Sequence, residues 1–184
     1  MDLETIRYPV GRLPRQTAPL DAAARAAHIA VIEQAPARIR SLVAGITEAQ
    51  LVASYRPGGW TVRQIVHHIP DSHMNAYVRM KLAATEESPT VKTYDEAKWA
   101  ELPEARTAPV EVSLALVDAL HRRWVAFLRA LPEADLRRTF MHADWGRVTI
   151  EESIAMYSWH CRHHAAHISI ALGRPVDADA TSLG

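Results

Sequence analysis

The chain has 184 residues, 48% of them hydrophobic and 23% charged, and its 21 basic and 21 acidic residues balance to zero net charge. This composition predicts one globular domain over residues 1–184 and argues against nucleic acid as a partner. No apolar run is long enough to span a membrane, and the start lacks the pattern of a signal peptide. Cys161 is the single cysteine, which fits a cytoplasmic protein. Because one cysteine cannot form a cysteine-based metal cluster, a metal site within the chain needs histidine or carboxylate ligands.

The first 46 residues divide into an arm and a helix. Residues 1–20 carry three prolines without a sustained period, which predicts an extended N-terminal arm. Asp21 is a suitable N-cap for a first long helix, within which Pro36 predicts a kink. Thr47 then caps a short turn over "TEAQL".

Three further long helices follow. A Pro-Gly-Gly turn in residues 56–60 precedes Thr61, which caps a helix that runs to about Glu86. The sequence predicts a short helical connector over residues 93–102, a third amphipathic helix over residues 109–131, and a small hairpin over residues 138–150. Thr149 and Glu152 form a capping box that opens the fourth helix. The predicted fold is all-α: an antiparallel four-helix bundle with short connecting helices and a small β-hairpin.

Histidines gather on two of these helices. Seven of the ten lie within residues 67–73 of the second helix and residues 160–167 of the fourth. Two helices of a bundle that face each other can hold a metal ion in the core between them. A single helical histidine is more often a surface or hydrogen-bonded residue, so helical geometry has to select the candidates.

On the fourth helix, Ile154 and Ile168 belong to the face that is expected to be buried. His160 and His164 lie four residues apart on an edge of that face, where both imidazoles can reach one ion. His163 and His167 turn further away, toward solvent or a neighbouring chain.

On the second helix, geometry leaves two candidates. His67 lies nearly opposite the buried face and is expected to be solvated. His68 lies on a border of that face, whereas His73 points close to it and is either the rival ligand or a core histidine hydrogen-bonded within the bundle. Beside His68 runs a polar stripe that is interpreted as a pocket wall: Thr61, Ser72, Asn75 and Arg79.

Several long motifs carry a resemblance to a known family. The segments "YPVG", "YRPGGWTVRQIVHHIPDSHMNAYVRMKLA", "YDEAKWAEL", "LHRRWVAFLRAL" and "YSWHCRHHAAHI" resemble the YfiT branch of the DinB-like superfamily, over about residues 8–168. The resemblance implies a four-helix bundle with a divalent metal on three histidines, which fall on His68, His160 and His164. It also implies a cytoplasmic, homodimeric protein. Pro70 and Cys161 depart from the pattern, and Cys161 is interpreted as incidental.

The resemblance implies two activities, described for the family as metal-dependent hydrolysis and as S-transfer of bacillithiol, with relatives that use mycothiol or glutathione. In the transferase hypothesis a small thiol binds the open position of the metal, zinc or nickel, as a thiolate and attacks an electrophile in detoxification. Ser72, Asn75 and Arg79 then hold the thiol, and residues 56–60 serve mainly to turn the chain.

In the hydrolase hypothesis the open position holds water. Neither Asp71 nor Glu152 is clearly aimed at the metal as a base, which favours thiol transfer. A third hypothesis is a metal-stabilised binding module without catalysis, against which an open three-histidine site argues.

Overall fold

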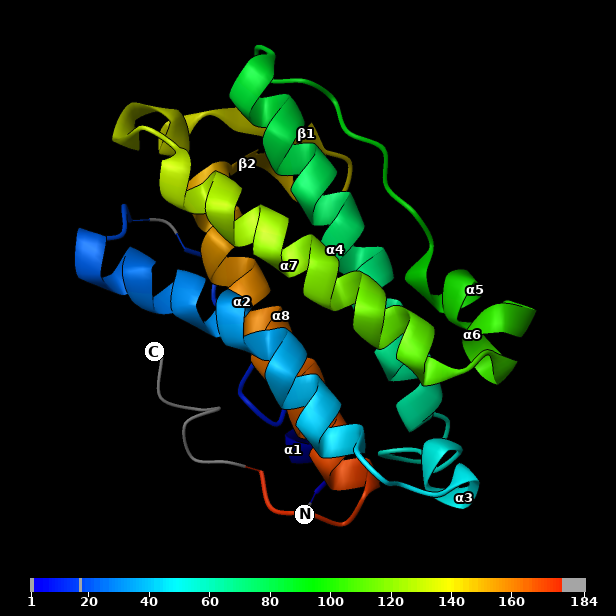
Figure 1. Cartoon of the computed structure of the whole chain (residues 1–184). Coiled ribbons are helices and arrows are strands. Elements are labelled where there is room, and N and C mark those ends of the chain that lie inside the picture. Colours follow the sequence, from blue (N-terminus) through cyan, green and yellow to red (C-terminus); the bar gives the residue numbers. More distant parts are fainter. Residues whose placement is uncertain (1, 17, 177–184) are drawn as a thin grey trace.

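The computed structural model describes residues 2–16 and 18–176 of the chain, and four long helices dominate it (Figure 1). These are α2 (Ala22–Val43), α4 (Val62–Thr85), α7 (Val110–Ala130) and α8 (Ile150–Ala171). The shorter elements are α1 (Leu3–Arg7), α3 (Glu48–Leu51), α5 (Glu96–Ala100), α6 (Pro103–Thr107), a 3-10 helix (Glu133–Arg137), β1 (Thr139–His142) and β2 (Gly146–Thr149). The predicted all-α four-helix bundle with short helices and a hairpin is confirmed.

The predicted N-cap residues begin their helices at the expected positions. The side chain of Asp21 accepts a hydrogen bond from the backbone of Ala24, and Thr61 and Thr149 each form a capping box. These caps satisfy backbone N–H groups that have no partner within the helix. Pro36 and Pro70 lie inside α2 and α4, and neither ends its helix.

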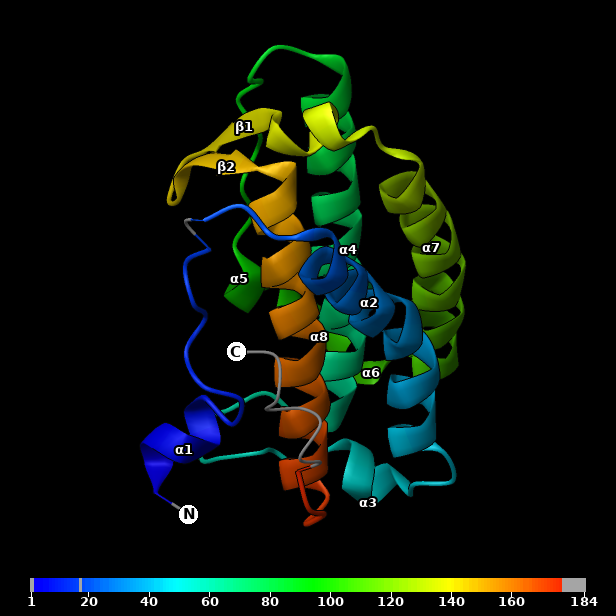
Figure 2. The ribbon, with the colours of Figure 1, turned by 90° about the vertical axis from the view of Figure 1, so that its left-hand side faces the viewer.

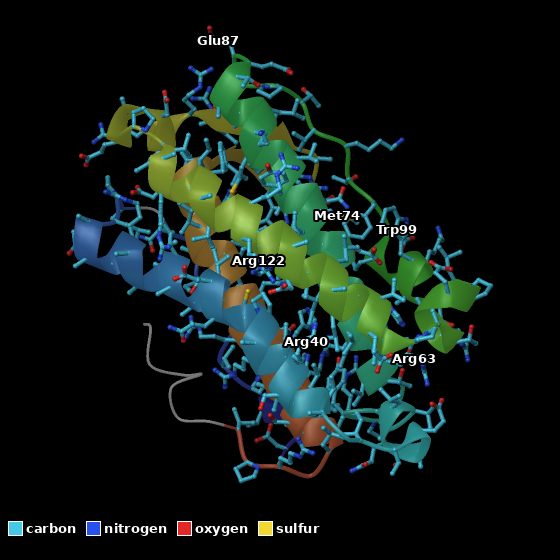
Figure 3. The ribbon with its side chains drawn as sticks, viewed as in Figure 1. Arg40, Arg63, Met74, Glu87, Trp99 and Arg122 are labelled. Carbon is cyan, nitrogen blue, oxygen red and sulfur yellow. The ribbon has the colours of Figure 1, made fainter. Side chains whose placement is uncertain are left out.

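The helix directions are mixed, which differs from the expected antiparallel arrangement. His67 of α4 contacts Ser113 of α7, and His73, further along α4, contacts His121, further along α7. These two neighbouring helices therefore run parallel. The helices α2 and α8 also run parallel, while α4 and α8 are antiparallel (Figure 1). The reason is the long connection from α4 to α7, which returns along the bundle before α7 starts. Glu87, labelled in Figure 3, marks the point where this connection begins.

The hairpin sits at one end of the bundle, beside the start of α8 (Figure 2). Its strands pair antiparallel, with Phe140 opposite Val148 and His142 opposite Gly146. The connection from α4 joins this sheet because the backbone N–H of Val91 donates to the carbonyl of Met141 at 3.0 Å. The returning segment and the hairpin therefore cover the same end of α4 and α8.

The N-terminal segment is not extended throughout. A short helix, α1, begins after Asp2, whose side chain accepts from the backbone of Thr5 at 2.9 Å. The chain then runs along α8 (Figure 2), where the indole Nε1 of Trp159 donates to the carbonyl of Gly11 at 3.1 Å. The prediction of an extended arm over residues 1–20 is thus wrong for α1, and positions 1 and 17 lie outside the described residues.

The hydrophobic core lies between the four long helices, each of which contributes buried apolar side chains to it. Trp124 and Met80 are fully buried there, and the indole N–H of Trp124 lies 3.2 Å from the sulfur of Met80. Close packing of this kind fixes the relative positions of α4, α7 and α8, which carry the histidines. Among the described residues, no helix combines the length and apolarity that crossing a bilayer requires.

Candidate metal centre

Three histidines from two antiparallel helices meet at the centre of the bundle. His68 comes from α4, and His160 and His164 lie one turn apart on α8. One ring nitrogen from each lies within 4.8 Å of the other two. His68 and His164 are buried, while His160 keeps part of its surface open to a cavity. The structure thus brings together the three residues that the resemblance selects.

The donor geometry fits a divalent cation. Nε2 of His68 lies 3.3 Å from Nε2 of His160. Two nitrogen ligands of a tetrahedral zinc ion at its usual bond length are about 3.3 Å apart, so this spacing suits coordination of one ion by both rings. Nδ1 of His164 is buried without a hydrogen-bond partner in the described part of the chain.

Burial keeps these rings neutral, the form in which imidazole binds metal. Desolvation lowers the pKa of His68 to about 4. The pKa values of His160 and His164 are lowered well below the ordinary value by desolvation first and then by the neighbouring histidines. At neutral pH, protons therefore do not compete with a cation for the three lone pairs.

A second row of histidines lies behind the cluster. Nδ1 of His160 is 3.0 Å from Nε2 of His73, and Nδ1 of His73 is 2.7 Å from Nε2 of His121. His73 is fully buried and is absent from the group that could share one ion. Of the two interpretations left open for His73, the structure supports the core histidine hydrogen-bonded within the bundle.

The cluster opens into a cavity of about 350 Å³ between α4, α8, the hairpin and the connection that follows α4. This volume is within the range of small-molecule sites. Its aromatic lining consists of Trp60, Tyr94, Phe140, Trp145, Tyr157 and Trp159. Its polar lining beside the cluster includes Ser72, Thr93, Arg79, Glu96, His142, Asp144 and Ser153.

The predicted polar stripe is split between two environments. Ser72 and Arg79 line the cavity, and the hydroxyl of Ser72 is 3.4 Å from Nε2 of His160. Asn75 does not line it, because its amide donates to the carbonyl of Asp71 at 2.8 Å. Thr61 is occupied as the N-cap of α4. The stripe is therefore a pocket wall only at Ser72 and Arg79.

Three histidines that were expected to face outward are buried. His67 bonds to the hydroxyl of Ser113 at 2.7 Å and to the carbonyl of Ala108 at 3.1 Å, so its predicted solvation is wrong. The chain between α6 and α7 covers it, and the helical repeat of α4 alone gave no sign of that cover.

His163 and His167 are also buried, so their predicted orientation toward solvent or another chain is wrong. The ring of His163 stacks on Trp159, and that of His167 stacks on Tyr55 at 3.9 Å between centroids. His167 also donates to the carbonyl of Arg7 at 3.3 Å. The N-terminal segment and the turn before α4 supply a cover that the four predicted helices do not include.

The sequence analysis did not predict several of the residues that line the cavity. Trp60, assigned to a turn, places its ring 4.6 Å from that of His68 and 6.3 Å from that of His164. Trp60 lies two helical turns before His68, next to the N-cap, and this spacing could have indicated that its side chain lies near His68. His142 and Trp145 reach the cavity from the hairpin. Their proximity depends on how the hairpin folds over α8, which no local pattern reveals.

The candidate bases and the cysteine lie elsewhere. The carboxylate of Glu152 accepts from the backbone of Thr149 at 2.6 Å within the capping box. Asp71 does not line the cavity, and burial raises its pKa to about 6. Cys161 is buried, and desolvation raises the pKa of its thiol to about 12, which leaves it protonated and unreactive at neutral pH.

The fold and the cluster together define a helical-bundle protein with a candidate three-histidine site for a divalent cation. Comparison with known proteins places it further: the chain belongs to the DinB superfamily, which it matches over residues 32–168. It is 46% identical over 167 residues to a "putative metal-dependent hydrolase" of Bacillus cereus (strain ZK / E33L), covering 91% of this chain and 95% of that protein.

A second relative carries the same description. It comes from Oceanobacillus iheyensis and is 51% identical over 138 residues, covering 75% of this chain and 80% of that protein. Among solved structures, YfiT from Bacillus subtilis, described as "a probable metal-dependent hydrolase with an unusual four-helix bundle topology", aligns with a TM-score of 0.87 and 41% identity. That alignment covers 93% of this chain and 99% of YfiT.

Proposed function

We propose that this protein is a metal-dependent transferase that joins a small thiol of the bacillithiol type to an electrophilic compound. The observation that carries the proposal is the combination at one cavity of the three-histidine cluster, the cationic side chain of Arg79 and a largely aromatic wall. These three features suit, respectively, a metal ion, an acidic thiol and an apolar electrophile.

The residues that would hold the ion are His68, His160 and His164, with zinc or nickel as the expected metal. Such an ion, when bound, lowers the pKa of a coordinating thiol so that it is a thiolate at neutral pH. The hydroxyl of Ser72, close to Nε2 of His160, is placed to donate a hydrogen bond to a group that enters beside the cluster.

Arg79 is proposed to bind a carboxylate of the thiol. Its guanidinium already donates to the carbonyl of Lys92 at 2.7 Å, which holds the side chain at the cavity wall. A carboxylate of the thiol bound in the cavity would accept a charge-assisted hydrogen bond from this guanidinium, which is stronger than a neutral hydrogen bond.

The aromatic wall is proposed to receive the electrophile, an alkyl halide or an epoxide for example. The sulfur of the thiol forms a bond to the electrophilic carbon with its electron pair, and the bond from that carbon to the leaving group breaks. A halide departs as an anion, whereas the oxygen of an opened epoxide takes a proton from solvent. The thiol proton is released to solvent, so the reaction needs no further reactant.

Hydrolysis is the second candidate, favoured by the descriptions of the relatives and by two carboxylates of the cavity lining, Glu96 and Asp144. A general base in a hydrolase must come within hydrogen-bond reach of the attacking water. The side-chain hydrogen bonds of His68 and His160 go to other histidine rings and to Ser72, and no carboxylate of the described residues is hydrogen-bonded to a ring nitrogen of the cluster. Thiol transfer needs no such base.

The test is an assay of metal-reconstituted protein with bacillithiol, mycothiol, glutathione or no thiol, each offered 1-chloro-2,4-dinitrobenzene. Thiol-dependent conjugation that is lost in His160→Ala supports the transferase and identifies the thiol. Metal-dependent cleavage of ester or amide substrates, without conjugation by any thiol, would replace it with the hydrolase. Metal binding without either reaction would point to a binding module.

A further inference from the structure

A chain of hydrogen bonds leads from the cluster to the opposite side of the bundle. It runs from Nδ1 of His160 to His73 at 3.0 Å, from His73 to His121 at 2.7 Å, and from Nδ1 of His121 to the carbonyl of Ile32 at 2.6 Å. Four helices contribute one residue each: α8, α4, α7 and α2. His73, His121 and Ile32 are at most 1% exposed, so water does not compete for these bonds.

The last acceptor is free because of a proline. In α2 the carbonyl of Ile32 would normally accept from the backbone N–H of residue 36, one turn later. Residue 36 is proline, which has no N–H. The carbonyl of Ile32 is therefore left without its helical donor, and His121 supplies one. Pro36 thus has a part in this chain besides its effect on the helix.

The carbonyl sets the direction of every bond. A carbonyl only accepts, so Nδ1 of His121 must carry the proton. A neutral imidazole has a single N–H, so Nε2 of His121 is bare and accepts from Nδ1 of His73. By the same step, Nε2 of His73 is bare and accepts from Nδ1 of His160. Nε2 of His160 then has a free lone pair, and it is the atom that faces Nε2 of His68 at 3.3 Å.

The opposite direction would need a charge in the core. If both nitrogens of His121 were protonated, His73 would accept at Nδ1 and donate at Nε2, and Nε2 of His160 would be protonated and unable to bind metal. Burial of His121, which is 1% exposed, opposes that cation. Asp118, one turn earlier on α7, favours the cation, but its carboxylate is paired with Arg122, and desolvation outweighs it in lowering the pKa of His121.

We infer that His73 and His121, anchored on the carbonyl that Pro36 leaves free, are positioning residues that hold His160 in the Nδ1–H tautomer and present its Nε2 to the metal. The inference rests on the proposed metal site, but its core statement concerns the metal-free protein. Partners behind a ligating histidine fix its tautomer and orientation, and their loss typically weakens metal binding 10–100-fold.

The first experiment measures the tautomers directly. Long-range ¹H–¹⁵N correlation spectra of the chelator-treated wild-type protein at pH 7.5, assigned with single histidine variants, distinguish the protonated from the bare nitrogen of each ring. The Nδ1–H form is expected for His160, His73 and His121 alike. The Nε2–H form at His160 overturns the inference, whether or not the protein binds metal or catalyses any reaction.

The second experiment separates hydrogen bonding from packing. His121→Phe fills the space but removes the acceptor for His73, so the zinc affinity is expected to fall 10–100-fold and the fixed tautomer of His160 to be lost. His121→Gln keeps a side-chain oxygen that can accept from His73 and is expected to recover most of the affinity. Equal losses in both variants would overturn the inference by assigning the effect to packing.

The matched control is His67→Phe. Like His121→Phe, it replaces a buried, hydrogen-bonded histidine by phenylalanine, but His67, on α4, is not part of the chain of hydrogen bonds. Its zinc affinity and the tautomer of His160 are expected to remain those of the wild type. If His121→Phe does not fold, the wild-type tautomers decide the matter alone.

Discussion

Nε2 of His68 on α4 and Nε2 of His160 on α8 face each other at 3.3 Å across the interface of two antiparallel helices. Both atoms belong to rings that burial keeps neutral. Two lone pairs directed at one point repel each other unless a proton or a cation lies between them. If the proposed cation occupies this position it should stabilise the bundle, which is the first prediction.

Zinc should stabilise the wild-type protein against unfolding. At a free concentration of about 100 times Kd, the free energy of unfolding is expected to rise by about 2.7 kcal/mol. In His160→Ala this increase should be largely absent, as measured by urea denaturation with and without zinc. His28→Ala serves as the control, because His28 lies on α2 outside the cluster and its loss should leave the zinc effect intact. An undiminished effect in His160→Ala would contradict the site.

Without metal, the protein should lose stability as the pH falls below about 6.5. Burial lowers the pKa of His121 to about 4, of His163 to about 3 and of His167 to about 4, from an ordinary value of 6.5. Between these values the unfolded chain binds more protons than the folded one, so acid favours unfolding.

Each such histidine contributes at most about 1.4 kcal/mol per pH unit over that interval, and about 1 kcal/mol between pH 6.5 and 5.5. Urea denaturation in the presence of a chelator at pH 7.5, 6.5 and 5.5 should therefore show little change over the first step and a clear decrease over the second. A free energy of unfolding that is flat from pH 7.5 to 5.5 would show that these rings are protonated in the folded state.

How far the sequence predicts the structure depends on whether a feature is local. The caps Asp21, Thr61 and Thr149 and the hairpin are set by residues a few positions apart, and they were predicted. The edge shared by His160 and His164 follows from the helical repeat in the same way. Geometry alone left His68 and His73 unresolved, because the distinction depends on which neighbouring helix each one faces.

The wrong predictions concern residues that are buried by segments distant in the sequence. His67 is buried by the segment before α7, and His163 and His167 by the N-terminal segment and Tyr55. The mixed helix directions likewise follow from where a long connection returns, not from the pattern of any helix. A helical repeat specifies which residues share a face, but the partner of that face is a property of the topology.

Arg79 should determine the preference for acidic thiols. In Arg79→Gln the KM for a carboxylate-bearing thiol is expected to rise about tenfold or more, since a charge-assisted hydrogen bond is lost, while kcat changes little. The KM for 2-mercaptoethanol, which has no carboxylate, should be unaffected. Steady-state kinetics with both thiols checks this.

The control for Arg79 is Arg122→Gln, which removes an exposed arginine of α7 that pairs with Asp118. Its kinetics should equal those of the wild type with both thiols. If Arg79→Gln raises the KM for both thiols equally, Arg79 shapes the cavity and does not bind the carboxylate.

Cys161 should be dispensable for catalysis. Its thiol is 3% exposed and its pKa is raised to about 12, so it lacks both the access and the ionisation of a nucleophile. Cys161→Ala is expected to retain the activity of the wild type. Iodoacetamide should label the wild-type protein in urea but not in its folded state, as followed by mass spectrometry. Rapid labelling of the folded protein together with loss of activity would identify a catalytic thiol.

X-ray absorption at the zinc edge of the reconstituted protein tests the central claim most directly, because it reports the ligands of the bound ion. A first shell with three imidazole nitrogens at about 2.0–2.1 Å is expected. His164→Ala should reduce the imidazole count or abolish binding, and His67→Phe should leave the spectrum unchanged. A shell dominated by carboxylate oxygens, or one that is unaltered in His164→Ala, would contradict a centre built on His68, His160 and His164.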